Sequence, residues 1–244
     1  MTSNDYSVAA RIYAESFSSS MKDDYRPMMP AENFVRIFRL FIEGNLPTER
    51  TPRCLDVGLG EGRHLAFLLS EGFECTGTEV SEEGLVLAKK VLGERPGYKL
   101  YRVEHGESLP NISDSPYDLI LCWETLHWFG HRDLIAEQLD LWKTALQENG
   151  RIVVTFPAEE HYLIVGGVHL GENLYLCEAA ERKGAIIFGC SYSEYTKMFL
   201  QSGLRVRSVI KYTHGRRDFE DGEVSFSATP DHPFAMYAFV LSAL

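Results

Sequence analysis

The sequence has 244 residues, enough for one large domain or two small ones. Apolar residues make up 45% and charged residues 24%, values that exclude a disordered, collagen-like or coiled-coil protein. Lys and Arg number 24 against 35 Asp and Glu, so the formal net charge is −11. Because such a surface repels phosphate groups, we expect neither a nucleic acid nor an anionic membrane surface as a partner.

The cysteine pattern indicates a reducing, cytoplasmic setting, because the number is odd and no C-x-x-C pair occurs. The first residues contain no apolar segment typical of a secretion signal. No apolar run approaches the roughly 18 residues that a helix needs to cross a bilayer. Neither H-E-x-x-H nor paired C-x-x-C spacing is present, so no metal site is expected. The cysteines are Cys54, Cys75, Cys122, Cys177 and Cys190.

Strands and helices are predicted to alternate through the first two thirds of the chain, which is typical of βαβ units and a parallel sheet. Short apolar runs next to glycines indicate buried strands, and apolar residues at helical spacing indicate the helices between them. Right-handed crossovers then place helices on both faces of the sheet. The predicted elements are helix 31–43, strand 53–57, helix 61–70, strand 73–80, helix 81–92, strands 98–103 and 117–123, helix 131–148 and strand 151–156.

The alternation breaks after residue 157. Residues 158–190 look irregular, with a helical stretch near 172–183. A helix over 193–202 leads to a strand over 204–212, and a last strand over 234–241 follows a loop with Pro230 and Pro233. Since no crossover helix joins these last two strands, they should be antiparallel neighbours.

These elements predict one α/β domain over residues 1–244, with a doubly wound, mostly parallel seven-stranded sheet and an antiparallel last strand. Residues 1–45 would form an N-terminal helical cap. Residues 157–192, inserted after the fifth strand, would form a lid over the substrate.

A glycine-rich loop carries the strongest local signal. It reads Leu55-Asp56-Val57-Gly58-Leu59-Gly60-Glu61-Gly62, follows a predicted strand and opens a predicted helix. Glycines permit positive φ and let a ligand approach the backbone closely. Glu79 stands 17 residues after Gly62, at the end of the second strand, where a carboxylate can accept hydrogen bonds from both ribose hydroxyls. Together these features predict an adenosine-type ligand.

The spacing of the loop disfavours a dinucleotide. The fingerprint G-x-G-x-x-G would place its third glycine at position 63, which is Arg63, and Glu61 would face a pyrophosphate unfavourably. Acidic residues suit a ligand without phosphates and with a positive centre, such as S-adenosylmethionine (SAM).

At this point the chain resembles the class I, seven-stranded SAM-dependent methyltransferases of the small-molecule type. The resemblance covers roughly residues 1–156 and the antiparallel ending, and it implies that SAM is the cofactor. It implies cofactor-binding roles for the acidic leader, the loop glycines and the ribose-binding acid, which are Asp56, Gly58, Gly60, Gly62 and Glu79.

Three further segments resemble motifs of that family. Gly106-Glu107-Ser108, followed by Leu109-Pro110, resembles the segment that lines the adenine, with Glu107 in place of the usual Asp. Tyr117–Trp123 and Leu126–Phe129 resemble the fourth strand and the segment after it. Tyr6 and Tyr13 resemble the N-terminal cap that closes over SAM, and Arg26 is a candidate partner of the methionine carboxylate.

Catalytic candidates follow the fourth strand: Trp123, Glu124 and His127. His127 would orient a substrate or accept its proton, and a packed loop histidine is an equally weighted reading. For His161, a solvated loop residue is the favoured reading. Asp118 begins its strand, so it should lie at the end away from the ligand and have a structural role.

The sequence therefore predicts methyl transfer from SAM to an O, N or S atom of an enclosed small molecule. Three alternatives stay open: a cyclase or lyase that consumes SAM itself and releases methylthioadenosine, a dinucleotide oxidoreductase, and a non-catalytic SAM-binding module. No oligomeric state is predicted. An RNA-binding patch is a weaker interpretation of five basic residues, because a solvent-exposed strand edge explains them more simply. Those residues are Arg205, Arg207, Lys211, Arg216 and Arg217.

Overall fold

A computed structural model describes residues 8, 11, 12, 14, 15, 29–109, 116–214, 217–220, 223–226 and 233–244. Its centre is a seven-stranded sheet with strand order β3-β2-β1-β4-β5-β12-β9. The pairs from β3 to β5 are parallel, and β12 runs antiparallel to both of its neighbours. The strands are β1 (Arg53–Val57), β2 (Glu74–Glu79), β3 (Tyr98–Arg102), β4 (Tyr117–Cys122), β5 (Leu146–Pro157), β9 (Leu204–His214) and β12 (Phe234–Ala243).

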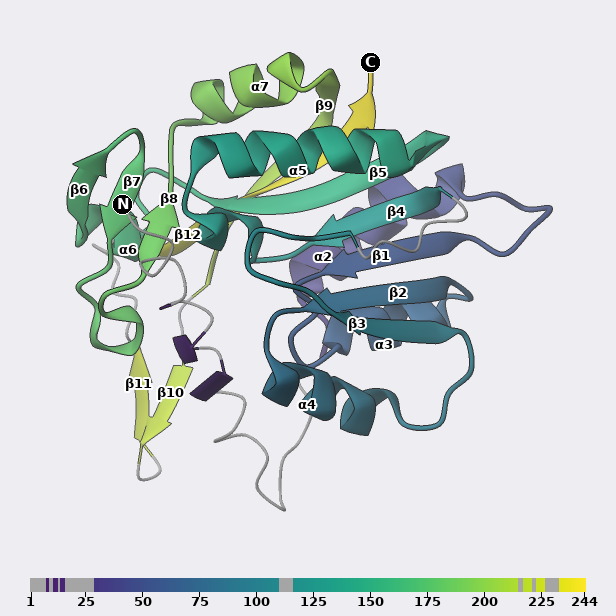
Figure 1. Cartoon of the computed structure of the whole chain (residues 1–244), viewed down its shortest axis with the longest axis horizontal. Helices are drawn as coiled ribbons and strands as arrows, with labels where there is room; N and C mark the ends of the chain where they lie inside the picture. The colour runs from purple at the N-terminus through teal and green to yellow at the C-terminus, as the bar shows by residue number, and fades with distance from the viewer. Residues whose placement is uncertain are drawn as a thin grey trace.

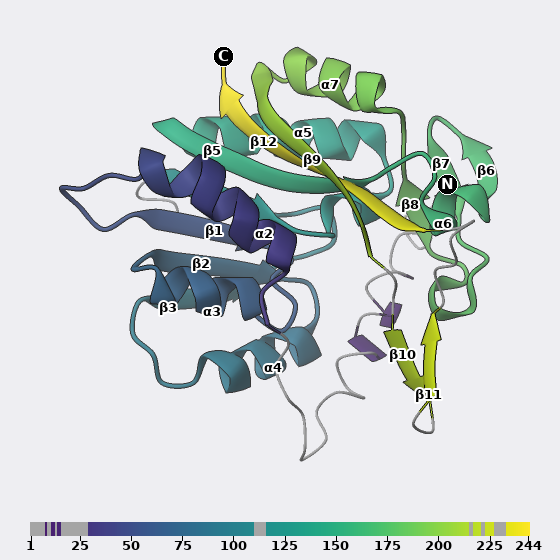
Figure 2. The same cartoon turned by 180° about the vertical axis from the view of Figure 1, so that it is seen from behind.

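Helices cover both faces of this sheet, as Figures 1 and 2 show from opposite sides. One face packs against α5 (Arg132–Ala145) and α7 (Tyr192–Gln201). The other packs against α2, α3 and α4. These helices are α2 (Glu32–Ile37), continued by a π-helical turn over Phe38–Ile42 and a 3-10 turn over Glu43–Asn45, α3 (Arg63–Ser70) and α4 (Glu82–Leu92). The two apolar cores differ because side chains alternate between the faces of each strand.

The predicted doubly wound sheet and its antiparallel last strand are therefore confirmed. The boundary between the fifth helix and the fifth strand was wrong: the helix expected to reach residue 148 ends at Ala145, and β5 begins at Leu146. Leu146 already has extended backbone angles. The pairing with β4 is irregular here, since Tyr117 lies opposite Leu146 and Leu119 lies opposite Arg151.

The insertion after β5 is not helical near residues 172–183, which corrects the expectation. It contains a short helix and a three-stranded antiparallel sheet of order β6-β7-β8. Glu172 and Asn173 both have positive φ, 52° and 64°, and form a two-residue hairpin turn that brings β6 and β7 together. The elements are α6 (Tyr162–Val165), β6 (Val168–Gly171), β7 (Leu174–Leu176), a 3-10 turn over Ala180–Arg182 and β8 (Ile186–Phe188).

A second small sheet stands between β9 and β12, where the sequence predicted only a loop. It is an antiparallel hairpin of β10 (Arg217–Glu220) and β11 (Glu223–Phe226). The two small sheets and α6 gather at one end of the main sheet (Figure 1). Val8 and Ile12 of the N-terminal segment pack against the insertion there.

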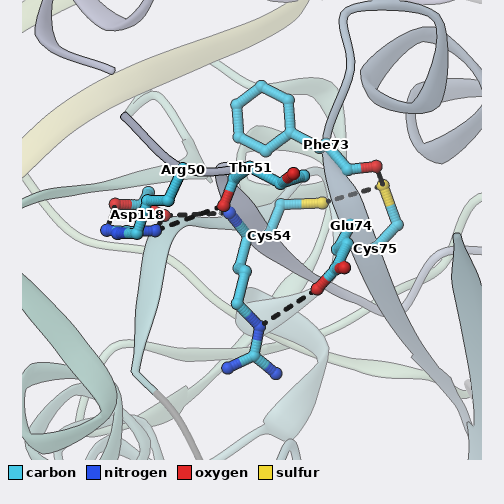
Figure 3. Close-up of polar contacts among 8 residues, drawn as sticks. Arg50, Thr51, Cys54, Phe73, Glu74, Cys75 and Asp118 are labelled. Atoms are coloured by element: carbon cyan, nitrogen blue, oxygen red, sulfur yellow. Dashed lines mark hydrogen bonds and ion pairs between the residues drawn. The ribbon is translucent and has the colours of Figure 1, made fainter. Parts of the chain in front are cut away.

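The amino end of β4 holds Asp118, as predicted (Figure 3). The Asp118 carboxylate accepts two hydrogen bonds from Arg50, at 2.6 and 2.8 Å, and one from the Arg53 backbone N–H at 2.9 Å. Nearby, Cys54 and Cys75 lie on paired strands with their sulfur atoms 3.2 Å apart, and burial raises the pKa of the Cys54 thiol. This edge is therefore structural.

Candidate active site

The glycine loop between β1 and α3 is held against the end of β2. The N–H groups of Gly58 and Leu59 both donate to the Thr78 carbonyl, at 2.8 and 3.0 Å. Gly58, Gly60 and Gly62 have φ of 67°, 57° and 81°, the left-handed region that favours glycine. A Cβ added at Gly58 would also collide with the Thr125 side chain. The loop therefore needs glycine both for its backbone and for its contact with the segment after β4.

Glu79 at the end of β2 is tied directly to this loop. Its carboxylate accepts the Gly60 N–H at 3.0 Å, and the N–H groups of Val80 and Ser81 at 2.9 and 3.1 Å. Burial raises the pKa of Glu79, and the three backbone donors oppose that rise. A carboxylate has about four acceptor positions, so about one is left for a sugar hydroxyl in this arrangement.

Asp56, near the end of β1, is 1% exposed, and its Oδ2 atom has no hydrogen-bond partner among the described residues. Burial raises its pKa to about 7, repulsion from Glu79 adds to the rise, and Arg63 opposes it. A buried acid with an unpaired oxygen fits a ligand that brings a positive charge. The ammonium and sulfonium groups of SAM satisfy that requirement, so the residues present fit this cofactor.

The loop after β3 is anchored from α5. Gly106 has a φ of 88°, and its carbonyl accepts a hydrogen bond from Gln138 at 2.8 Å. The Ser108 hydroxyl donates to the Gln138 side chain and accepts from the Trp142 indole at 2.7 Å. The Glu107 carboxylate turns back onto the backbone N–H of Glu104, at 3.3 Å. In this arrangement the side chains of Glu107 and Ser108 bond within the protein.

Trp123 follows the last residue of β4 and stacks on Tyr212 of β9, with ring centroids 5.7 Å apart and an interplanar angle of 14°. The rings of Phe34 and His64 contact the same indole. Its Nε1 atom is buried and has no hydrogen-bond partner in the part of the chain that the structure describes. Trp123 is therefore a core aromatic whose polar atom is unsatisfied.

Glu124 has a φ of 57°, which is costly for a residue with a side chain. Two contacts hold it there: its N–H donates to Thr155 Oγ1 at 2.7 Å, and the Tyr212 hydroxyl donates to its carboxylate at 3.3 Å. Burial first, and then Glu124, raises the pKa of Tyr212. Backbone strain of this kind clusters at functional sites.

His127 lies in the 3-10 turn Leu126–Phe129, which packs against β5 and β8. It is 3% exposed, and its Nδ1 atom has no partner among the described residues. The turn is joined to the glycine loop through Thr125, whose hydroxyl donates to the Gly58 carbonyl at 3.3 Å. His127 therefore lies beside the segment that touches the candidate cofactor loop.

His161 is not the solvated loop residue that the sequence favoured. It is 2% exposed and caps α6, accepting the Leu163 N–H at Nδ1 over 3.2 Å. It also contacts the rings of Tyr162 and Phe234. Burial of His161 depends on β12 and the insertion, which are distant in sequence.

Sequence reasoning also missed Tyr212, Thr125 and Thr155, whose contacts with Glu124 and Gly58 exist only in the folded sheet. No short motif signals them. The predicted cap residues Tyr6, Tyr13 and Arg26 lie outside the described residues.

The described part of the chain offers neither a metal site nor a membrane span. No group of three or more His, Cys, Asp or Glu side chains is arranged there to hold a metal ion. None of its helices has the length and hydrophobicity required to cross a membrane.

Comparisons with known proteins agree with this geometry. Residues 55–152 match the model of a family described as a methyltransferase domain. None of the curated proteins matches the chain by sequence.

Solved structures extend the similarity to almost the whole chain. The CcbJ methyltransferase from Streptomyces caelestis has a TM-score of 0.62 at 16% identity, over 95% of this chain and 98% of that one. The magnesium protoporphyrin IX methyltransferase from Synechocystis, with bound S-adenosylhomocysteine, has a TM-score of 0.61 at 13% identity, over 98% and 100%. A pericyclic reaction enzyme has a TM-score of 0.53 at 14% identity, over 84% of this chain and 47% of that one.

The family model matches residues 55–152, and the structural neighbours show that the chain has the fold of the class I methyltransferases. The resemblance to the class I SAM-dependent methyltransferases is thereby confirmed.

Proposed function

We propose that this protein transfers the methyl group of SAM to a small-molecule acceptor in the cytoplasm. When bound, SAM supplies a methyl group on a sulfonium, which a nucleophile displaces in line. The observation that carries the proposal is the buried pair of acids beside the glycine loop: Glu79, hydrogen-bonded to Gly60, and Asp56, with an unpaired oxygen. This donor set suits a phosphate-free nucleoside with a positive charge better than it suits a pyrophosphate.

The chain's own residues divide the work between two sides of the site. On the cofactor side, we propose that the backbone of Gly58, Gly60 and Gly62 contacts SAM. Glu79 would bind the ribose hydroxyls, and Asp56 would face the positive charge. The adenine would lie along the segment of Gly106, Glu107 and Ser108. Because the Ser108 hydroxyl already bonds within the protein, we expect that segment to contribute mainly backbone groups.

The insertion and the N-terminal segment, which cover the region after β4, support a small acceptor. The insertion packs on Trp128, and Val8 and Ile12 pack on the insertion, so apolar groups cover the region after β4. We therefore propose residues 157–192 as a lid and residues 1–45 as a cap within one domain. Tyr6, Tyr13 and Arg26 belong to that cap. We propose Trp123, Glu124 and His127 as the residues on the acceptor side, with the packed Trp123 contributing through its unsatisfied Nε1 atom.

Calorimetry with SAM and with S-adenosylhomocysteine tests the proposal. Glu79→Ala should weaken binding about ten- to hundredfold, since hydrogen bonds to a charged group contribute about 1.5–3 kcal/mol. Glu82→Ala is the matched control, because Glu82 is an exposed acid in the first turn of α4. Absence of binding by the unaltered protein, or equal binding by the two variants, would refute it.

A further inference from the structure

His127 has a defined tautomer in this structure. Its ring forms a hydrogen bond with the Thr155 backbone that favours the protonated ring, so the partner is the Thr155 carbonyl and the ring nitrogen donates. Because Nδ1 has no partner among the described residues, the donor is Nε2. Nδ1 therefore carries a lone pair and can only accept a hydrogen bond.

The surroundings keep this ring neutral. His127 is buried against Trp128, with ring centroids 5.0 Å apart, and the charged form is opposed by burial first and by His161 second. These effects lower the pKa of His127 to about 3. Among the described residues, no donor reaches the Nδ1 lone pair of His127. A buried acceptor left without a donor costs about 1–3 kcal/mol. A ligand that donates a hydrogen bond would remove that cost.

The neighbours of the ring indicate which ligand that is. Trp128 belongs to an apolar cluster that joins the turn after β4 to the insertion and contains Leu163, Cys177, Ala185 and Ile187. An apolar wall with one lone pair suits an uncharged donor. An ionised carboxylate would bring its own lone pairs against Nδ1 and find no donor there.

We infer that the acceptor presents an un-ionised hydroxyl group to Nδ1 of His127, which aligns the hydroxyl and takes its proton during methyl transfer. This inference rests on the proposed function. As the oxygen forms its new bond to the methyl carbon, the carbon–sulfur bond breaks with its electron pair staying on sulfur. The hydroxyl proton moves to Nδ1 and is later released to water.

The weak basicity of His127 separates hydroxyl from amine acceptors. An oxygen that is being alkylated becomes strongly acidic, so even a weak base removes its proton as the bond forms. A methylated ammonium holds its proton far more tightly than a neutral His127 attracts it. His127 therefore assists methylation at oxygen and gives no comparable assistance at an amine.

The experiment supplies the purified protein with methyl-labelled SAM and a mixed library of small alcohols, phenols, amines and carboxylic acids. Mass spectrometry identifies the group that is methylated. Methyl ethers as the main products support the inference, whereas methylamines or methyl esters as the main products overturn it. Affinity for SAM is measured on the same samples, so loss of SAM binding refutes the proposed function and product identity refutes only this inference.

Variants at His127 provide the second arm. His127→Phe and His127→Gln should lower kcat about 10²- to 10⁴-fold, the usual contribution of a positioned acid or base, with the Kd for SAM unchanged within about twofold. His131→Asn, at the N-cap of α5 and outside the proposed lid, is the control and should retain kcat, because asparagine also caps helices well. Unchanged kcat in both His127 variants overturns the inference.

A readout that does not depend on turnover is ¹⁵N NMR of the histidine imidazoles. The sample contains S-adenosylhomocysteine and the library alcohol that the protein methylates. The Nδ1 resonance of His127 should shift on addition of that alcohol and should not shift with the matching amine. A shift that is equal for both compounds contradicts the assignment.

Discussion

The backbone N–H of Gly60 donates to the carboxylate of Glu79 at 3.0 Å, which makes the glycine loop and the acid at the end of β2 one hydrogen-bonded unit. Gly60 lies in the loop between β1 and α3 and Glu79 is the last residue of β2, yet the conformation of the loop fixes the position of the carboxylate. Affinity for a nucleoside should therefore respond to the loop backbone as well as to the acid.

The first prediction concerns Gly60→Ala. The left-handed backbone at Gly60 should cost an alanine about 1–2 kcal/mol and displace the N–H from Glu79. We expect weaker SAM binding by calorimetry together with lower stability. Gly93→Ala is the control: Gly93 also has positive φ and open space around it, so stability should fall while SAM affinity stays unchanged. Equal affinities in the two variants would contradict the prediction.

The second prediction concerns pH and Asp56. Its pKa is raised from 3.8 to about 7 in the folded protein, so the folded state binds more protons than the unfolded state between those values. In the protein without ligand, the contribution of Asp56 to the free energy of unfolding should therefore be most favourable below about pH 4. It should decrease as pH rises toward 7, by roughly 4 kcal/mol at most. Glu79 shifts in the same direction.

Asp56→Asn removes the group and should flatten that decrease. Urea unfolding of both proteins at pH 5 and pH 8 measures the difference in slope, which is independent of any constant cost of the substitution. If the variant loses as much stability as the unaltered protein between the two pH values, Asp56 is not the titrating group.

The third prediction separates the two contacts of Tyr212. Tyr212→Phe keeps the stack on Trp123 and removes the hydroxyl that bonds Glu124, so it should cost about 0.5–1.5 kcal/mol of stability. Tyr212→Leu removes the stack as well and should cost more. Chemical denaturation followed by tryptophan fluorescence compares them, and identical losses would show that the stack adds nothing.

The fourth prediction addresses a SAM-consuming cyclase or lyase. Incubated with SAM and no acceptor, the protein should leave SAM intact, because the assigned residues complete a reaction only when an acceptor is present. Chromatography for methylthioadenosine checks this outcome, with the Glu79→Ala protein as the blank. Release of methylthioadenosine by the unaltered protein alone would favour the cyclase or lyase instead.

Much of the fold follows from local sequence signals. The run ending in Val57 is buried on both faces of the sheet, and Gly58, Gly60 and Gly62 require conformations that few other residues adopt. Ser81 caps α4 through the Gly84 N–H, as its position before a helical pattern indicates. Such features depend on neighbours in sequence and are therefore visible in it.

The insertion and the second side of the site depend on contacts between distant residues. Glu172 and Asn173 form the turn of the hairpin between β6 and β7, both at positive φ. Because Glu is not a residue type that predicts such a turn, the sequence gives little indication of it. Tyr212 has the sequence context of an ordinary strand aromatic, and its partners Trp123 and Glu124 come directly after β4. Only the strand order places β9 and β4 so that these side chains meet.

The position of β12 has a consequence for how the molecule is assembled. This strand comes late in the chain but lies between β5 and β9, and its residues enter both apolar cores. Since β9 has no strand to pair with until β12 arrives, neither half of the interior can close early. Folding should therefore be a single late event with long-range contacts in its transition state, and partial chains that stop before Phe234 should remain open and prone to association.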